Sequence, residues 1–109
     1  MISKPTVSQQ LHHIINKNIT TDIHIAELCS QVAMSESTLR RKLNNEGTNL
    51  QEIKDQVRLG TGLHLLQTTH LPINIIAEKC GYLSQSRFSD RFKLRFGLTP
   101  SSLRKTRFD

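Results

Sequence analysis

One pattern of residues occurs twice in this 109-residue chain and limits its possible folds more than any other feature. In each copy, a short segment with apolar residues at helical spacing is followed by a turn of three or four residues. A serine then starts a second helical segment, where its hydroxyl can accept a hydrogen bond from the first turn. A shift of 49 positions aligns Met34 with Leu83, Ser35 with Ser84, Leu39 with Phe88 and Leu43 with Phe92. The pattern predicts two helix-turn-helix motifs.

The remaining segments are also typical of helices. Apolar residues recur at three- and four-residue spacing around Leu11, Leu28 and Ile76, and no segment alternates apolar and polar residues as a half-buried strand would. Gly47 and Gly81 are placed to end helices, since glycine readily adopts the left-handed conformation that follows a last helical turn. We therefore expect an all-α fold of about seven helices.

Positive charge is concentrated near the end of the chain. The formal net charge is +6, and the first 35 residues, with two bases and two acids, contribute nothing to it. Residues 79–107 contain eight bases and a single acid, Asp90, which gives this segment a charge of +7. Such a cluster favours binding to nucleic acid or another anionic surface, although basic residues on helices also serve solubility alone.

A longer helical segment, residues 49–68, lies between the two copies. A helix of about 20 residues is roughly 30 Å long, close to the roughly 34 Å between successive major grooves on one face of B-DNA. Gly60 and Gly62 weaken this helix by about 1 kcal/mol each relative to Ala, unless they allow close packing. The side chains expected to face inward are Leu50, Ile53, Val57, Leu63 and Leu66. We expect one domain over residues 1–109, with a first lobe at 7–48, a linker helix at 49–68 and a second lobe at 69–107.

Several classes of protein are disfavoured. The chain has no apolar run of about 18 residues and no apolar signal core near its start, so we expect a cytoplasmic protein with no membrane segment. Cys29 and Cys80 fall on helix faces that are expected to be buried. We expect them to be small core residues and not to form a disulfide. The histidines are not paired with cysteines at zinc-finger spacing, and there is no glycine-rich phosphate loop or nucleophile elbow. We therefore expect no metal, no cofactor and no enzymatic activity.

A long motif extends from Ile76 to Arg104. It consists of Ile-Ala, a Gly-aromatic turn, a Ser-x-Phe helix start, Phe-Lys, Gly-x-Thr-Pro and a closing Arg. The residues that fit it are Ile76, Ala77, Gly81, Tyr82, Ser86, Phe88, Phe92, Lys93, Gly97, Thr99, Pro100 and Arg104. With Leu28, Ser35, Arg41 and Gly47 in the first copy, the chain resembles AraC/XylS-type transcription regulators over about residues 20–105. Arg87 departs from the family pattern, which commonly has an aromatic residue there.

The resemblance implies a fold of about seven helices, in which a long helix joins two helix-turn-helix lobes. It also implies sequence-specific binding to double-stranded promoter DNA and activation of transcription, often through contact with RNA polymerase. Many members carry a separate N-terminal effector or dimerisation domain, for which this chain has no room. The chain is therefore expected to be a short member or an excised domain. With two recognition helices of its own, it is expected to bind as a monomer to an asymmetric or direct-repeat site.

Recognition is expected on the outward faces of the two serine-capped helices. The candidates for reading base edges are Ser37, Arg40 and Arg41 in the first helix and Gln85, Ser86, Arg87, Ser89 and Asp90 in the second. Asp90 has three alternative roles: accepting from cytosine, orienting Arg87 or Arg91, or forming an ordinary surface salt bridge. The candidates for phosphate contact are Lys42, Arg91, Lys93 and Arg95, with the backbone N–H groups at the helix starts of Ser35 and Ser84. The basic residues at the end of the chain, Arg104, Lys105 and Arg107, are interpreted as a solubilising tail.

Two other functions are compatible with the residues. A protein-interaction module or antagonist would keep the fold without specific DNA binding, and Asp90 and the neutral first third of the chain allow this. A binder of RNA or single-stranded DNA would usually expose aromatic side chains for base stacking. The phenylalanines Phe88, Phe92 and Phe96 follow helical spacing, which favours core packing over stacking.

Overall fold

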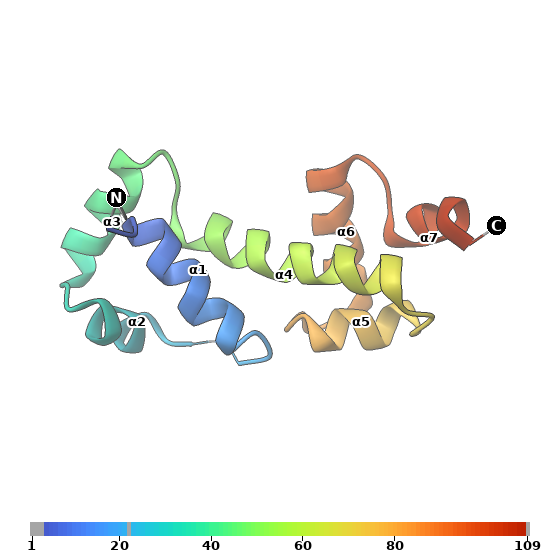
Figure 1. Cartoon of the computed structure of the whole chain (residues 1–109), viewed down its shortest axis with the longest axis horizontal. Helices are drawn as coiled ribbons and strands as arrows, with labels where there is room; N and C mark the ends of the chain where they lie inside the picture. The colour runs from blue at the N-terminus through green and yellow to red at the C-terminus, as the bar shows by residue number, and fades with distance from the viewer. Residues whose placement is uncertain (1–3, 22, 109) are drawn as a thin grey trace. The chain divides into compact units, whose positions relative to one another are not determined.

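The chain is helical throughout the part that its structure describes. The computed structural model describes residues 4–21 and 23–108, with side chains up to residue 106. Within these residues there are seven helices and no strand (Figure 1). The helices are α1 (Val7–Lys17), α2 (Ile25–Val32), α3 (Glu36–Asn45), α4 (Leu50–Thr68), α5 (Ile73–Lys79), α6 (Gln85–Phe96) and α7 (Pro100–Phe108). The expected all-α fold of about seven helices is confirmed.

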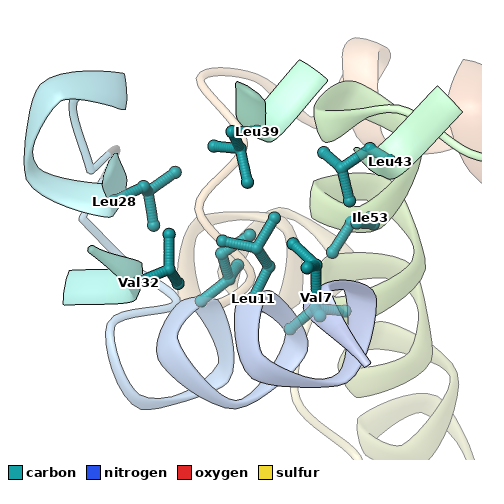
Figure 2. Close-up of a cluster of buried hydrophobic side chains, with 9 residues drawn as sticks. Val7, Leu11, Leu28, Val32, Leu39, Leu43 and Ile53 are labelled. Atoms are coloured by element: carbon teal, nitrogen blue, oxygen red, sulfur yellow. The ribbon is translucent and has the colours of Figure 1, made fainter. Parts of the chain in front are cut away.

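The helices form two compact units, Met1–Val57 and Arg58–Asp109, and the boundary between them falls inside α4. The first unit has its own hydrophobic core, to which each of its helices contributes. Leu11 of α1, Leu28 of α2 and Leu39 of α3 are fully buried, and Figure 2 shows these side chains pointing toward one another. Each such burial stabilises the unit by about 1.5–3 kcal/mol relative to an exposed side chain.

The second unit is built around aromatic rings. Phe88 and Phe92 of α6 are fully buried, and their ring centroids lie 5.6 Å apart. The Tyr82 ring lies 5.5 Å from Phe88 and the Phe96 ring 4.6 Å from Phe92, so four rings form a continuous series. Tilted ring pairs at these separations are favourable beyond the area that they bury. The core interpretation of the phenylalanines is therefore confirmed.

Gly62 of α4 allows α6 to pack closely. A Cβ atom at this position would lie 2.6 Å from Cε1 of Phe88, closer than real Cβ atoms come to other heavy atoms. A Cβ at Gly60 would meet no heavy atom within 4 Å. Of the two explanations for these glycines, close packing therefore holds for Gly62 and not for Gly60.

The α4 side chains confirm most of the expected inward positions and add one. Ile53, Val57 and Leu66 are buried, whereas Leu50 and Leu63 are partly buried against the clusters. Leu59, which was not predicted, is only 2% exposed and belongs to the second cluster. Leu59 projects within about 20° of Leu66, whereas Ile53 and Val57 of the first cluster lie on a different side of α4.

The two cysteines carry free thiols, as expected for small core residues. Cys29 is half-buried against the first cluster and Cys80 is fully buried in the second. Burial raises the pKa of the Cys80 thiol to about 11, so this side chain is a neutral apolar group at physiological pH.

The turns of the two helix-turn-helix motifs are similar but differ by one residue. Both begin at a left-handed residue, Ala33 (φ 56°) or Gly81 (φ 87°). The next backbone N–H donates to a carbonyl five residues earlier, from Met34 to Cys29 and from Tyr82 to Ala77, at 3.0 Å in each case. Met34 and Tyr82 therefore have the same role, and the alignment of Met34 with Leu83 is corrected. Leu83 is an additional turn residue and is 90% exposed.

One long-range contact within each unit holds a helix end in place. In the first unit, the Glu46 carboxylate accepts from the backbone N–H groups of Val7 and Ser8, at 3.2 and 3.1 Å, where α1 begins. In the second, the guanidinium of Arg104 donates to the carbonyl oxygens of Leu71 and, at 3.2 Å, Thr69. Arg104 is thus part of the packed structure. The interpretation of it as a solubilising tail residue is wrong, and the side chain of Arg107 lies outside the described residues.

Candidate DNA-binding helices

The second helix of each motif begins at the predicted serine. The Ser35 hydroxyl accepts from the Thr38 backbone N–H at 3.2 Å, and the Ser84 hydroxyl accepts from the Arg87 N–H at 3.1 Å. Serine caps of this kind are worth about 1 kcal/mol each relative to Ala. The caps fix where α3 and α6 begin, and therefore which of their residues face outward.

The inward face of α3 is apolar and its outward face is basic. Leu39 and Leu43 are buried, with 0% and 1% of their surface exposed. The predicted base-reading residues Ser37, Arg40 and Arg41 and the predicted phosphate contact Lys42 are all exposed. The helix therefore presents two adjacent guanidinium groups and one ammonium group to its surroundings.

Arg40 is held by an acid of its own helix. Its Nη2 and Nε atoms lie 3.0 and 3.1 Å from Oε1 of Glu36, one helical turn earlier. Both side chains are more than half exposed, so the pair adds little stability, on the order of 0.3–0.5 kcal/mol. Glu36 thus pre-orients the planar guanidinium of Arg40, and DNA binding would have to compete with this weak pair.

The outward face of α6 is longer and more basic. Arg87, Arg91, Lys93 and Arg95 are exposed while Phe88 and Phe92 hold the opposite face in the core. The remaining predicted base-reading residues are the exposed Gln85, Ser86 and Asp90 and the half-buried Ser89. Arg and Gln side chains can make bidentate hydrogen bonds to guanine and adenine, and a carboxylate can accept from cytosine N4.

The beginnings of the two helices differ in charge. The first turn of α3 contains Glu36, whereas the first turn of α6 contains no acidic residue. Helix N-termini attract phosphate through their backbone N–H groups and the helix dipole, and an acid in the first turn opposes that attraction. The start of α6 is thus the more favourable of the two for a phosphate group.

The net charge of the chain resides entirely in the second unit. Residues 1–57 contain six bases and six acids, whereas residues 58–109 contain nine bases and three acids. The first unit is therefore neutral, and the second has a formal charge of +6. One base of the second unit, Arg58, lies with its guanidinium carbon 6.0 Å from the centroid of the Tyr82 ring, within the range of a cation–π contact.

One exposed residue of α6 was missed by the sequence reasoning. Leu94 is 80% exposed, between the basic residues Lys93 and Arg95. The other large apolar side chains of α6 face the core. The signal was its spacing, because Leu94 lies seven positions after Arg87 and away from the phenylalanine stripe. The Glu46 and Arg104 contacts were also missed, since they join residues more than 30 positions apart and leave no local pattern.

Features of other protein classes are not found in the described parts of the chain. Among residues 4–21 and 23–106, no three His, Cys, Asp or Glu side chains gather as they would around a metal ion. None of the described helices combines the length and apolar character that crossing a membrane requires.

The chain is similar to known proteins over most of its length. A family model described as "Helix-turn-helix domain" matches residues 28–106. The chain is 31% identical over 97 residues to the urease operon transcriptional activator of Escherichia coli, and 31% identical over 100 residues to the HTH-type transcriptional regulator GadX of the same species. These matches cover 89% and 92% of the chain but only 33% and 36% of the relatives, so it spans about a third of their length.

A solved structure extends the similarity to the fold. It is the crystal structure of a DNA-binding transcriptional dual regulator from Escherichia coli K-12, with 29% sequence identity and a TM-score of 0.89. The match covers 94% of this chain and 99% of the other. Because the family model also matches well over half of the residues, the chain belongs to the AraC-type helix-turn-helix family of DNA-binding transcription regulators.

Proposed function

We propose that this chain binds double-stranded promoter DNA sequence-specifically and activates transcription, with α3 and α6 as its two recognition helices. One observation supports this most: each unit holds a serine-capped helix with an apolar inward face and a basic outward face. The activator role is supported by the similarity to the urease operon transcriptional activator. By analogy with other activators of this family, RNA polymerase is the proposed protein partner.

The proposed division of labour follows the chemistry of the side chains. Arg41, Gln85 and Arg87 read base edges, with Ser37, Arg40, Ser86, Ser89 and Asp90 as the other base-reading candidates. Lys42, Arg91, Lys93 and Arg95 contact phosphates, together with the N–H groups at the starts of α3 and α6. Asp90 would be repelled by phosphate, so its place is opposite a base edge or beside one of the neighbouring arginines.

We propose that the two helices read successive major grooves. The support is the length of α4, since a helix of 19 residues is roughly 29 Å long, against about 34 Å for one turn of B-DNA. One chain would then supply both halves of the contact and bind as a monomer, with residues 7–48 and 69–107 as its two lobes. Its site would be asymmetric or a direct repeat.

The direct test is selection of bound sites from random duplex DNA, followed by titration of the recovered site at several salt concentrations. The expected result is a motif with two half-elements about one helical turn apart. Its affinity should fall steeply with salt while remaining resistant to competitor DNA. A motif with one half-element would show that only one of the helices reads sequence, and would end the two-groove proposal.

The neutral first unit favours one competing function, a module that binds protein and keeps the fold without specific DNA binding. The same titration separates the two functions. An antagonist would bind selected and scrambled duplexes equally weakly and lose both at moderate salt. A regulator keeps a large difference between the two duplexes, typically 10³-fold or more for a specific site.

A further inference from the structure

Leu94 is exposed where an ordinary recognition helix has little reason to place a large apolar side chain. It is 80% exposed, and single exposed leucines are common enough on protein surfaces to need no explanation by themselves. What makes this one informative is its position on α6, the helix proposed above to read DNA.

Leu94 lies on the same outward stripe as two of the base-reading candidates. Successive residues of a helix are about 100° apart, so Leu94 projects within about 20° of Arg87 and about 40° of Asp90. The buried Phe92 projects about 160° away from it. Arg87, Asp90 and Leu94 therefore form a continuous outward row. A surface that lies along the Arg87 side of α6 also meets Leu94.

The surroundings of Leu94 indicate the kind of surface that it meets. Arg91, Lys93 and Arg95 are exposed within three positions of it, and the unit as a whole has a charge of +6. An apolar protein partner would leave these charges facing an apolar surface, whereas DNA supplies phosphates for them. The principal apolar group on base edges in the major groove is the C5-methyl of thymine.

We infer that Leu94 is a specificity-determining residue that packs against the C5-methyl group of a thymine in the major groove read by α6. This inference rests on the proposed function. Leu94 lies about 10 Å beyond Arg87 along the helix axis. Because base pairs are about 3.4 Å apart, the thymine lies about three base pairs from the one that Arg87 contacts.

The first unit lacks this contact, which makes the inference specific to one half of the site. When the two motifs are aligned on their serine caps, a shift of 49 positions, Asn45 of α3 corresponds to Leu94. Asn45 is exposed and polar, so it offers no apolar surface to a methyl group. The methyl contact should therefore appear only in the half-element that α6 reads.

Deoxyuridine tests the contact atom by atom, since it differs from thymidine only by the absence of the C5-methyl. Each thymine of the selected duplex is replaced singly by deoxyuridine, and the affinity is measured for the wild-type chain and for Leu94→Ala and Leu94→Asn. One position in the α6 half-element should lose about fourfold in affinity with the wild type, the effect of one buried methyl group. Leu94→Ala and Leu94→Asn should each bind the thymine duplex and the duplex with deoxyuridine at that position equally.

Leu83→Ala is the matched control, because among the side chains that the structure describes Leu83 is the other large apolar one that is strongly exposed, and it lies in the turn before α6. It should keep the full fourfold difference. Circular dichroism checks that the variants fold, which is expected since Leu94 takes no part in the core. Selective binding with no deoxyuridine-sensitive position, or a sensitive position that persists in Leu94→Ala, overturns this inference alone. Absence of any selective binding overturns the proposed function as well.

Discussion

Arg40 and Arg41 are consecutive residues of α3 in different situations. Glu36 holds the guanidinium of Arg40 at 3.0 Å, whereas Arg41 is exposed one position further along the helix. A guanidinium that is already oriented loses less freedom when it binds, but it must leave its carboxylate to do so. If α3 reads DNA as proposed, its two neighbouring arginines differ in how readily they can contact a base.

We predict that Arg41→Ala lowers affinity for the selected site and relaxes the base preference at one or two adjacent base pairs. A bidentate arginine–guanine pair contributes about 1–3 kcal/mol of discrimination, and its loss should appear in one half-element only. Repeating the site selection with the variant measures the effect. If the recovered motif is unchanged, Arg41 does not read bases.

Glu46 gives the first unit a dependence on pH. Its side-chain bond with Ser8 and the N–H groups at the start of α1 hold the pKa of this carboxyl below its ordinary value of 4.5. A group with a lowered folded pKa stabilises the native state above pH 4.5, and this stability is lost as the pH falls through the folded pKa. We predict that Glu46→Gln is less stable than the wild type at pH 7 and that the difference shrinks as the pH falls below 4.5 and the carboxyl becomes protonated.

Urea unfolding of both proteins at a series of pH values measures this difference. The control is Glu52→Gln, which removes an exposed acid of α4 in the same unit. An equal loss in both variants would mean that general charge effects, and not the anchoring of α1, explain the change.

At the scale of a helix, the close approach of α4 and α6 depends on one missing methyl group. We predict that Gly62→Ala destabilises the chain by about 1–2 kcal/mol, because its Cβ would overlap the fully buried Phe88 ring and outweigh the gain in helix propensity. Gly60→Ala is the matched control. It should stabilise the chain by about 1 kcal/mol, since nothing lies within 4 Å of its Cβ. Thermal unfolding of the two variants decides the matter, and a stabilised Gly62→Ala would contradict the packing argument.

The turn of the first motif uses an unfavourable residue. Ala33 has φ 56° and ψ 46°, a left-handed conformation that glycine adopts without strain, as Gly81 does in the second motif. We predict that Ala33→Gly stabilises the chain by about 0.5–1 kcal/mol with no change in the recovered DNA motif. A decrease in the unfolding midpoint would contradict this.

Local patterns predicted the helices and their ends well. Ser35 and Ser84 fixed the starts of α3 and α6, and the glycines Gly47 and Gly81 marked two of the ends, since each acts through its own backbone. Contacts between distant parts of the chain were not predictable in this way. Glu46 reaches residues 38 and 39 positions earlier and Arg104 reaches 33 and 35 positions back, so no periodicity records them. Leu59 was not predicted, although it lies seven positions before the predicted Leu66 and on the same side of α4.

The candidate site divides along the same line. The outward positions of Arg41, Arg87 and Lys93 followed from the apolar stripes of α3 and α6. The pairing of Arg40 with Glu36 is compatible with four-residue spacing but had not been inferred from it. Which of these side chains reads a base and which contacts a phosphate depends on the DNA, and remains a prediction.

At the scale of the whole chain, charge is unequally divided between a neutral unit and a basic one. We predict that the double substitution Lys93→Ala and Arg95→Ala weakens binding to all duplexes about equally. It should reduce the slope of log affinity against log salt by about two, because each lost phosphate contact removes about one released counterion. Titrations at several salt concentrations with selected and scrambled duplexes measure both effects.

Lys4→Ala with Lys17→Ala is the matched control, because it removes the same charge from exposed positions outside α3 and α6. Its slope should stay close to that of the wild type. If both double variants lose the same slope, the net charge matters but the position of the charges on α6 does not.

We expect the unequal charge to divide the search for a DNA site into two steps. Long-range attraction to phosphate would act on the basic unit, which would then arrive first and slide along non-specific DNA. Binding of the neutral unit would then be intramolecular, because the covalent link through α4 sets its local concentration near the duplex. The first unit would thus test the sequence only at positions where the second unit is already bound to DNA. A change of ionic strength would alter how often the chain arrives more than which sites it keeps.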